Sequence, residues 1–307
     1  ESVKLFYTGS SWVSKQQESD VRPSGARGQL FGYNSGGAID PGSLNTIDKY
    51  PFAVDTNASD VGDISTAESG RGGQSSISHG YSSSATDIDK FPFAVDTNAI
   101  DIGNLTVTRG NVGAQSSKVS GYVSGGSPSS NVIDKFPFAV DTNASDVGDL
   151  TQGRSQNGGT SSLEFGYNAG GSPPVRNTID KFPFAVDTNA SDVGDLSAAK
   201  RQAAGTNSKE FGYASGGQDA STPLNVIERF PFASDSNATD LADLTQSRRF
   251  PGGQSSTTHG YNSGGYSTSA PTGHFDTIDK FPFASEANAS DVGNLTQARS
   301  NLAGHQV

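Results

Sequence analysis

One segment of 17 residues recurs six times and organises the chain. Its clearest copy, residues 134–150, reads DKFPFAVDTNASDVGDL. Every copy keeps a Pro-Phe-Ala core, then an Asn, and an Asp three residues after the Asn. Successive copies are 41, 45, 46, 48 and 51 residues apart, counted between Pro51, Pro92, Pro137, Pro183, Pro231 and Pro282. A period of roughly 20–50 residues is typical of solenoids, propellers and other repeat architectures.

Each repeat also contains a Gly-Tyr pair followed by a variable loop. The pairs begin at Gly32, Gly80, Gly121, Gly166, Gly212 and Gly260. The most diverse loops are residues 38–45, 127–131, 171–177, 218–225 and 266–275. A Thr-x-x-Arg exit closes most copies, with Arg109, Arg154, Arg248 and Arg299, whereas Glu68 and Lys200 stand in that place in the other two. Variation confined to one segment indicates surface loops carried on a constant scaffold.

The repeat is built from strands, because no segment keeps an apolar i, i+3, i+4 spacing over three turns. Within residues 46–52, Ile47 and Tyr50 fall on opposite faces of an extended strand, so both faces carry apolar groups. A blade packed between two neighbours needs this pattern, whereas a sheet in a two-layer sandwich leaves one face polar. The small side chains of the Gly-Tyr-x-Ser-Gly-Gly strand predict that it lies near the axis of a ring.

We therefore predict an all-β fold, a six-bladed β-propeller closed by pairing of the N- and C-terminal segments. Seven blades with a degenerate N-terminal blade are the alternative. Residues 32–307 hold the six repeats, and residues 1–31 form an N-terminal arm or a degenerate partial blade. The chain stops where the next repeat would begin, and residues 26–33 supply the missing part, so the two ends are expected in one blade or in adjoining blades.

Composition limits the classes of function. The formal net charge of −11 disfavours nucleic acid as a partner. The absence of cysteine excludes a disulfide framework, a Cys nucleophile and Cys metal ligands. No apolar run approaches the ~18 residues of a membrane span. No Gly-x-Ser-x-Gly elbow and no phosphate-binding loop occurs. We expect neither enzymatic activity nor a cofactor.

The order of motifs carries a resemblance. Tyr-x-x-Gly-Gly, a variable loop, an apolar strand, an Asx-rich turn, a second strand and Thr-x-x-Arg together resemble the kelch-type β-propeller repeat over residues 32–299. The kelch tryptophan of the fourth strand is missing, which leaves three or four strands per blade open. The wording IDKFPFAxDTNASDVGDLT also resembles repeats in virion and tail-associated proteins of marine cyanobacterial phages. That resemblance implies a virion or extracellular location, with other virion proteins or a host-surface glycan or protein as partners.

The DTNASDVGD segment offers one candidate metal site. It places Asp55, Asn57, Asp60 and Asp63 within nine residues, and oxygen ligands so spaced suit Ca²⁺. The EF-hand pattern is not met, and the equivalents of Asp55 and Asp63 include Glu286 and Asn104. The favoured interpretation is an Asx turn whose side chains accept hydrogen bonds from nearby backbone N–H groups. Ca²⁺ binding at these residues and their repeat equivalents is the alternative.

Charged residues recur with the repeat as well. Asp48 and Lys49 are adjacent in a strand and point to opposite faces, so charges that bridge blades or line a solvated rim are expected. The exit arginines are expected to pair with such acids. Of the four histidines only His79 and His259 share a repeat position, so no metal role is assigned to them.

These features favour a non-enzymatic structural or adhesion module of a phage virion or tail that presents its variable loops to a partner. A multivalent carbohydrate-binding, lectin-like propeller is the alternative, with six pockets between blades. Tyr33 and its equivalents would be the stacking platforms of such pockets if exposed. Burial of these tyrosines between blades is the favoured interpretation, because aromatic residues dominate cores.

Overall fold

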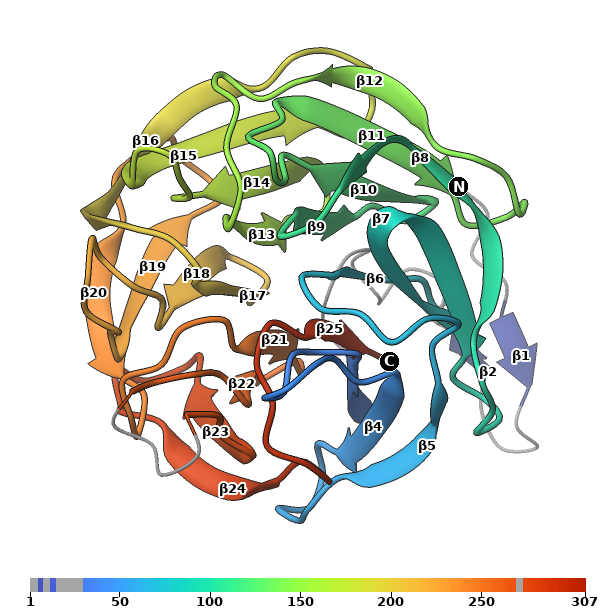
Figure 1. The fold of residues 1–307 in the computed structure, drawn as a ribbon. Helices are drawn as coiled ribbons and strands as arrows, with labels where there is room; N and C mark the ends of the chain where they lie inside the picture. The colour runs from blue at the N-terminus through green and yellow to red at the C-terminus, as the bar shows by residue number, and fades with distance from the viewer. Residues whose placement is uncertain (1–4, 8–11, 15–29, 269–272) are drawn as a thin grey trace.

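The computed structural model describes residues 5–7, 12–14, 30–268 and 273–307, and within these ranges the regular structure is entirely β-strand. Six antiparallel sheets stand around a central axis (Figure 1). The prediction of a six-bladed β-propeller is thereby confirmed, and the seven-bladed alternative is wrong. Strands β1 (Leu5–Tyr7) and β2 (Trp12–Ser14) pair only with each other among the described residues. No helix suited to crossing a membrane occurs in the described ranges.

Four blades have four separate strands, which follow one another from the axis outward. Blade 3 holds β9 (Gly113–Ser116), β10 (Ser120–Ser124), β11 (Val132–Pro137) and β12 (Ser145–Asp149). Blade 4 holds β13 (Gly158–Ser161), β14 (Phe165–Ala169), β15 (Arg176–Pro183) and β16 (Ser191–Lys200). Blade 5 holds β17 (Ala204–Asn207), β18 (Phe211–Ser215), β19 (Val226–Pro231) and β20 (Thr239–Asp243). Blade 6 holds β21 (Gly252–Ser255), β22 (His259–Ser263), β23 (Thr277–Pro282) and β24 (Ser290–Asn294).

Blade 2 follows the same path with three strands, β6 (Gly72–Ser75), β7 (His79–Pro92) and β8 (Ile100–Arg109). The first half of β7 pairs with β6 and the second half with β8. Gly80 faces Phe91 across the two halves, as Gly121 faces Phe136 in blade 3. The connection within β7 is so short that both arms form one continuous bent strand. Each blade therefore has a four-stranded path, and the choice between three strands and four is settled.

Blade 1 closes the ring with strands from both ends of the chain. Its innermost strand is β25 (Ala303–Gln306), followed by β3 (Phe31–Ser35), β4 (Thr46–Pro51) and β5 (Ser59–Asp63). β25 pairs antiparallel with β3, from Ala303 opposite Ser35 to Gln306 opposite Gly32. The Val307 carbonyl also accepts hydrogen bonds from the backbone N–H groups of Leu30 and Phe31 at 2.7 and 3.1 Å. The predicted closure between the terminal segments is confirmed.

The strand nearest the axis differs from the one that the sequence suggested. The Gly-Tyr strand is second from the axis, and the short strand that contains Gly-Gln-Ser in blades 2 and 6 is innermost. Inner strands of adjacent blades pack so closely that a Cβ added to Gly205 would lie 2.0 Å from the Gly159 carbonyl oxygen. Small residues are therefore needed near the axis, as expected, but one strand further in.

Aromatic side chains fill the space between blades. Each Gly-Tyr tyrosine is at most 2% exposed and packs on a phenylalanine of the next blade. The Tyr81 and Phe138 ring centroids, for example, are 4.7 Å apart, and those of Tyr122 and Phe184 are 4.8 Å apart. The glycine before each tyrosine leaves room for an aromatic ring of the neighbouring strand, because a Cβ on Gly121 would lie 2.3 Å from Phe136 Cζ. The aromatic residues that recur in every repeat thus hold adjacent blades together.

Candidate functional site

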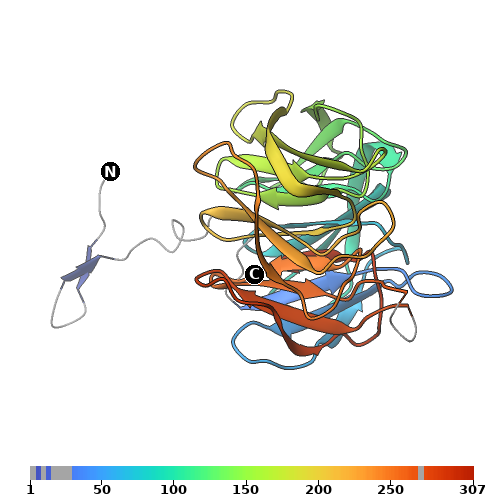
Figure 2. The same cartoon turned by 90° about the vertical axis from the view of Figure 1, so that its left-hand side faces the viewer.

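Strand direction sorts the connections onto two opposite faces, which Figure 2 shows at the two sides of the ring. The variable loops lie beside the exit segments that link one blade to the next, as isolated bridges show: Ala38 to Ser300, Gly110 to Ser127, Ser155 to Ser172, Arg201 to Gln218 and Arg249 to Tyr266. We call this side the loop face. The DTN turns and the turns that precede each Gly-Tyr strand lie on the other side, which we call the turn face. The described parts of the variable loops therefore share one face.

A closed ring of backbone hydrogen bonds surrounds the axis at the loop face. One residue from each blade junction takes part, and its N–H donates to the carbonyl of the preceding member at 2.6–2.9 Å. The members are Gly70, Asn111, Gln156, Gln202, Phe250 and Asn301. All six have φ between +54° and +74°, a region that residues other than Gly, Asn and Asp rarely adopt. The hydrogen bonds hold this conformation at every junction.

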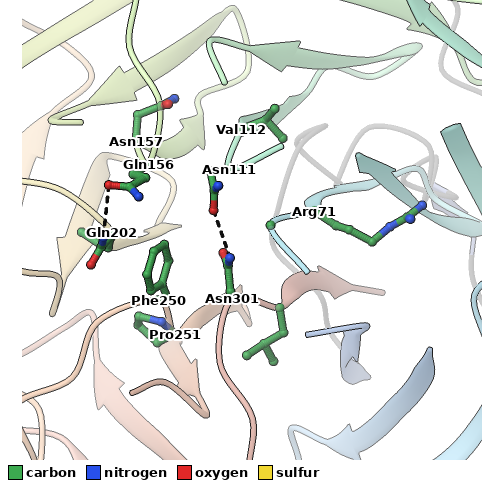
Figure 3. A pocket seen from close by; sticks show the side chains of 12 residues that line it. Arg71, Asn111, Val112, Gln156, Asn157, Gln202, Phe250, Pro251 and Asn301 are labelled. Atoms are coloured by element: carbon green, nitrogen blue, oxygen red, sulfur yellow. Dashed lines mark hydrogen bonds between the residues drawn. The ribbon is translucent and has the colours of Figure 1, made fainter. Parts of the chain in front are cut away.

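The ring lines a small axial pocket of about 70 Å³ that is open to solvent (Figure 3). Its lining combines five amide side chains, five apolar residues that include Phe250, and the cationic Arg71. Asn301 donates to the Asn111 amide oxygen at 3.0 Å, and Gln202 donates to that of Gln156 at 3.1 Å. The Gln202 Oε1 atom is buried and has no hydrogen-bond partner in the described part of the chain. Sequence reasoning missed this pocket, because residues from six junctions build it and no motif contains it.

Six buried ion pairs join the blades between the two faces. The acid is the Asp or Glu that follows the recurring Ile of the third strand in each blade. The cation comes from the exit segment of the preceding blade. The pairs are Asp48–Arg299, Asp89–Arg71, Asp134–Arg109, Asp180–Arg154, Glu228–Lys200 and Asp279–Arg248, at 2.6–3.3 Å. Their side chains are at most 1% exposed. The prediction that the exit arginines pair with these acids is confirmed.

One member of these pairs was not foreseen. Glu68 occupies the exit position between blades 1 and 2, and Arg71, three residues later, supplies the cation instead. The Arg71 guanidinium lies 2.8 Å from Asp89 and 3.0 Å from Glu68. Because every blade buries an acid, a junction without a cation at the exit position required one nearby, and Arg71 is the first arginine downstream. The need to balance the buried acid of blade 2 was therefore the sequence signal that could have identified Arg71.

Electrostatics marks these pairs as structural. Burial lowers the pKa of Arg154, and the adjacent Asp180 carboxylate offsets part of this effect. At the junction with blade 2, burial raises the pKa of Asp89, while Arg71 opposes the rise. Each acid also accepts hydrogen bonds from a Ser or Thr of the preceding blade, as Asp134 does from Thr106 N at 2.9 Å. These buried ion pairs and their hydrogen bonds therefore hold neighbouring blades in register.

Three of the four candidate Ca²⁺ ligands, Asp55, Asn57 and Asp60, lie at the turn face. Asp55 pairs with Lys280 of blade 6 at 2.5 Å, and Asn57 accepts a hydrogen bond from Asn294 N at 3.1 Å. Asp60 accepts from Gly62 N within its own strand at 3.1 Å. Asp63 lies at the far end of β5 and pairs with Thr46 in the sheet. Only Asp60 makes the local contact expected of an Asx turn, whereas Asp55 and Asn57 contact blade 6. No group of three or more candidate His, Asp or Glu ligands occurs among the described residues.

Rim salt bridges repeat around the turn face. Each joins the Lys or Arg that follows the buried acid to an acid of the next blade: Lys49–Asp96, Lys90–Asp141, Lys135–Asp187, Lys181–Asp235, Arg229–Glu286 and Lys280–Asp55. Their acids are 46–69% exposed. Asp48 thus forms a buried pair with Arg299 at one blade junction, and Lys49 forms a rim pair with Asp96 at the next. Both the charges that bridge blades and the solvated rim that the sequence predicted are present.

The histidines do not assemble into a site. His79 and His259 each lie 2.8 Å from the hydroxyl of the preceding residue, and burial lowers the pKa of both. His274 packs against Tyr266 on the loop face, with ring centroids 5.2 Å apart. His305 is fully buried in β25.

The fold and its two faces define the chain as a six-bladed β-propeller whose recurring polar residues lie largely at blade junctions. A scan against protein-family models and a search of curated proteins gave no match.

Proposed function

We propose that the chain is a non-enzymatic adhesion or structural module that binds a partner through its loop face. The observation that carries this proposal is the sorting of the variable loops onto one face of a constant ring. A scaffold that keeps its junctions nearly constant while its loops diverge is typical of proteins that bind through loops. The buried charges support this function too, because the ion pairs of the six junctions are engaged in holding blades together.

A loop exchange tests the proposal, and the chain supplies its own replacement. Blade 2 joins the two arms of β7 through the short connection at residues 84–87, so the ring tolerates a minimal loop there. Replacing residues 218–225 of blade 5 with that connection should abolish binding to the partner and leave the thermal melt within a few degrees of the native chain. Unchanged binding after the same exchange in blades 1, 3, 4 and 5 would exclude the loop face.

We place the module on a phage virion or tail, with other virion proteins or a host-surface glycan or protein as its partners. Support comes from the resemblance of the repeat sequence IDKFPFAxDTNASDVGDLT to repeats of phage virion proteins. Immunolabelling of purified virions tests this location, and particles that lack the chain would contradict it.

Carbohydrate binding is the second candidate, and the axial pocket favours it. The tyrosines that were to serve as stacking platforms between blades are buried, so six such sites are ruled out. The axial pocket instead offers one site, where neutral amides and the unpartnered Gln202 Oε1 suit hydroxyl groups and the Phe250 ring suits a sugar face. A glycan array comparing the native chain with Phe250→Ala tests this candidate. Equal signals, or no signal for the native chain, would exclude it.

A further inference from the structure

The turn face breaks the sixfold symmetry in the exposure of apolar side chains. Each DTN turn is preceded by a valine in blades 1 to 4, and these valines are 61–63% exposed: Val54, Val95, Val140 and Val186. Blades 5 and 6 carry Ser234 and Ser285 at the same position. The turn keeps its shape with either residue, since Asn237 and Asn288 make the same contacts to the preceding blade as Asn189. The valines are therefore not required by the fold.

A second set of exposed apolar residues follows the same four blades. Just before the Gly-Tyr strands lie Leu30, Ile77, Val119 and Leu163, which are 52–68% exposed. In blades 5 and 6 the turns before these strands read Lys209-Glu210 and Thr257-Thr258. Both sets lie at the same end of the blades, because Phe138 N donates to the Val119 carbonyl at 2.8 Å and equivalent bonds recur in the other blades.

Together these residues place exposed apolar side chains on the turn face of four consecutive blades. Of the ten large hydrophobic residues most exposed in the described chain, these eight and Ile100 of blade 2 lie on the turn face or at its edge. Only Val107 lies elsewhere, in an exit segment of the loop face. Isolated exposed hydrophobic residues are ordinary, whereas a group confined to one face indicates a contact surface.

Charge identifies what this surface suits. The rim cations are neutralised by their salt bridges, which leaves one exposed acid outside any salt bridge at the start of each outer strand of the described ring: Asp60, Asp101, Asp146, Asp192, Asp240 and Asp291. In the turns of blades 3 and 4, the exposed Lys118 and Glu164 offset each other, so the balance stays acidic. Like charges would repel a second copy docked through the same face, and also nucleic acid or an anionic membrane. The complementary surface is apolar and basic.

We propose that the turn face of blades 1 to 4 docks a protein that presents apolar side chains flanked by Lys or Arg. This interaction is independent of the loop face, so a module bound here would direct its variable loops away from the docked protein. Blades 5 and 6 would remain uncovered and would set the orientation of that protein around the axis.

A synthetic amphipathic peptide of Leu and Lys is the probe, with a scrambled peptide of the same composition and a Leu-Glu peptide as comparisons. The test variant carries Val54→Ser, Val95→Ser, Val140→Ser and Val186→Ser, and serine is the residue that the chain itself uses in blades 5 and 6. Val107→Ser, on the loop face, is the matched control. Binding is followed by fluorescence anisotropy, and the contacted blades are identified by hydrogen exchange.

We expect the Leu-Lys peptide to bind the native chain and the control equally, and the quadruple variant at least about tenfold more weakly, because apolar area is lost at four contacts. Protection should appear in the turns of blades 1 to 4, and salt should weaken binding. Equal affinity of the quadruple variant, equal binding of the scrambled peptide, or protection of blades 5 and 6 would overturn the proposal. So would self-association of the native chain that the quadruple variant loses, since the occupant would then be a second copy.

Discussion

His305 lies on the closing strand β25, at the position where blades 2, 3 and 6 carry Gln74, Gln115 and Gln254. Its Nδ1 lies 3.2 Å from the Gln74 carbonyl oxygen, and its Nε2 lies 2.8 Å from Ser35 Oγ. A carbonyl only accepts, so Nδ1 of the neutral imidazole carries the proton. Burial, with a smaller contribution from the cationic Arg71, lowers the pKa of His305 to about 4. The imidazole is therefore held neutral at the seam of the ring.

This seam should make stability depend on pH. Unfolded His305 binds a proton below its ordinary pKa of 6.5, whereas the folded imidazole resists protonation down to about pH 4. Stability is therefore full above pH 6.5 and falls as the pH drops from 6.5 to 4, by about 3 kcal/mol in total. Urea unfolding of the native chain and of His305→Gln between pH 7 and 4 measures the effect. The variant should lose less stability over that range, and parallel curves would contradict the assignment.

The two kinds of ion pair should differ in their contribution to stability. Asp180→Asn leaves the Arg154 guanidinium buried without a counter-charge, and we expect a loss of about 3–5 kcal/mol. Asp187→Asn makes the same chemical change at the rim, where the aspartate is 53% exposed, and should cost less than about 1 kcal/mol. Chemical denaturation of both variants checks the contrast. Similar losses would mean that the buried pair does not hold the junction.

Among strands and turns, the glycine before each tyrosine has a testable role. A Cβ at Gly121 would lie 2.3 Å from the Phe136 ring, so Gly121→Ala should force the ring aside and cost about 1–3 kcal/mol. Gly110→Ala is the matched control, because the nearest atom to its added Cβ is 3.5 Å away. Thermal unfolding of the two variants distinguishes them. A Gly121→Ala melt equal to that of Gly110→Ala would show that the aromatic ring yields freely.

The strands themselves were largely predictable, because Ile47 and Tyr50 already placed apolar groups on both faces of the repeated strand. The identity of the innermost strand was not. Gly, Gln and Ser carry little hydrophobic pattern, and only the convergence of six blades shows that Gly205 and Gly159 meet at the axis. The axial ring was also hidden, since Gln156 and Phe250 share no residue type with Asn111. Their likeness lies in backbone conformation, which side-chain patterns do not record.

The ring as a whole depends on its seam. Deleting residues 1–33 removes the first half of β3, including Tyr33, whose ring lies 4.9 Å from Phe93. Burial of a large apolar side chain contributes about 1.5–3 kcal/mol, and several would be exposed against a total stability of about 5–15 kcal/mol. We expect this deletion to unfold or aggregate, whereas deleting residues 1–18 leaves β3 intact and should be milder. A thermal melt of both decides, and a native-like melt of the longer deletion would contradict closure through β3.

The same seam has a consequence for where the polypeptide can be opened. Four residues, 76 to 79, stand between the paired Ser75 and Gly80 of blade 2. Only three, Val307, Leu30 and Phe31, stand between the paired Gln306 and Gly32. If residues 1–29 were removed and Val307 were joined to Leu30 through one added residue, this sixth turn would equal the other five in length. A ring joined in this way has no first blade, and a circular permutant opened at Ile77 would keep every strand pairing of the six blades while its ends moved one blade around the axis.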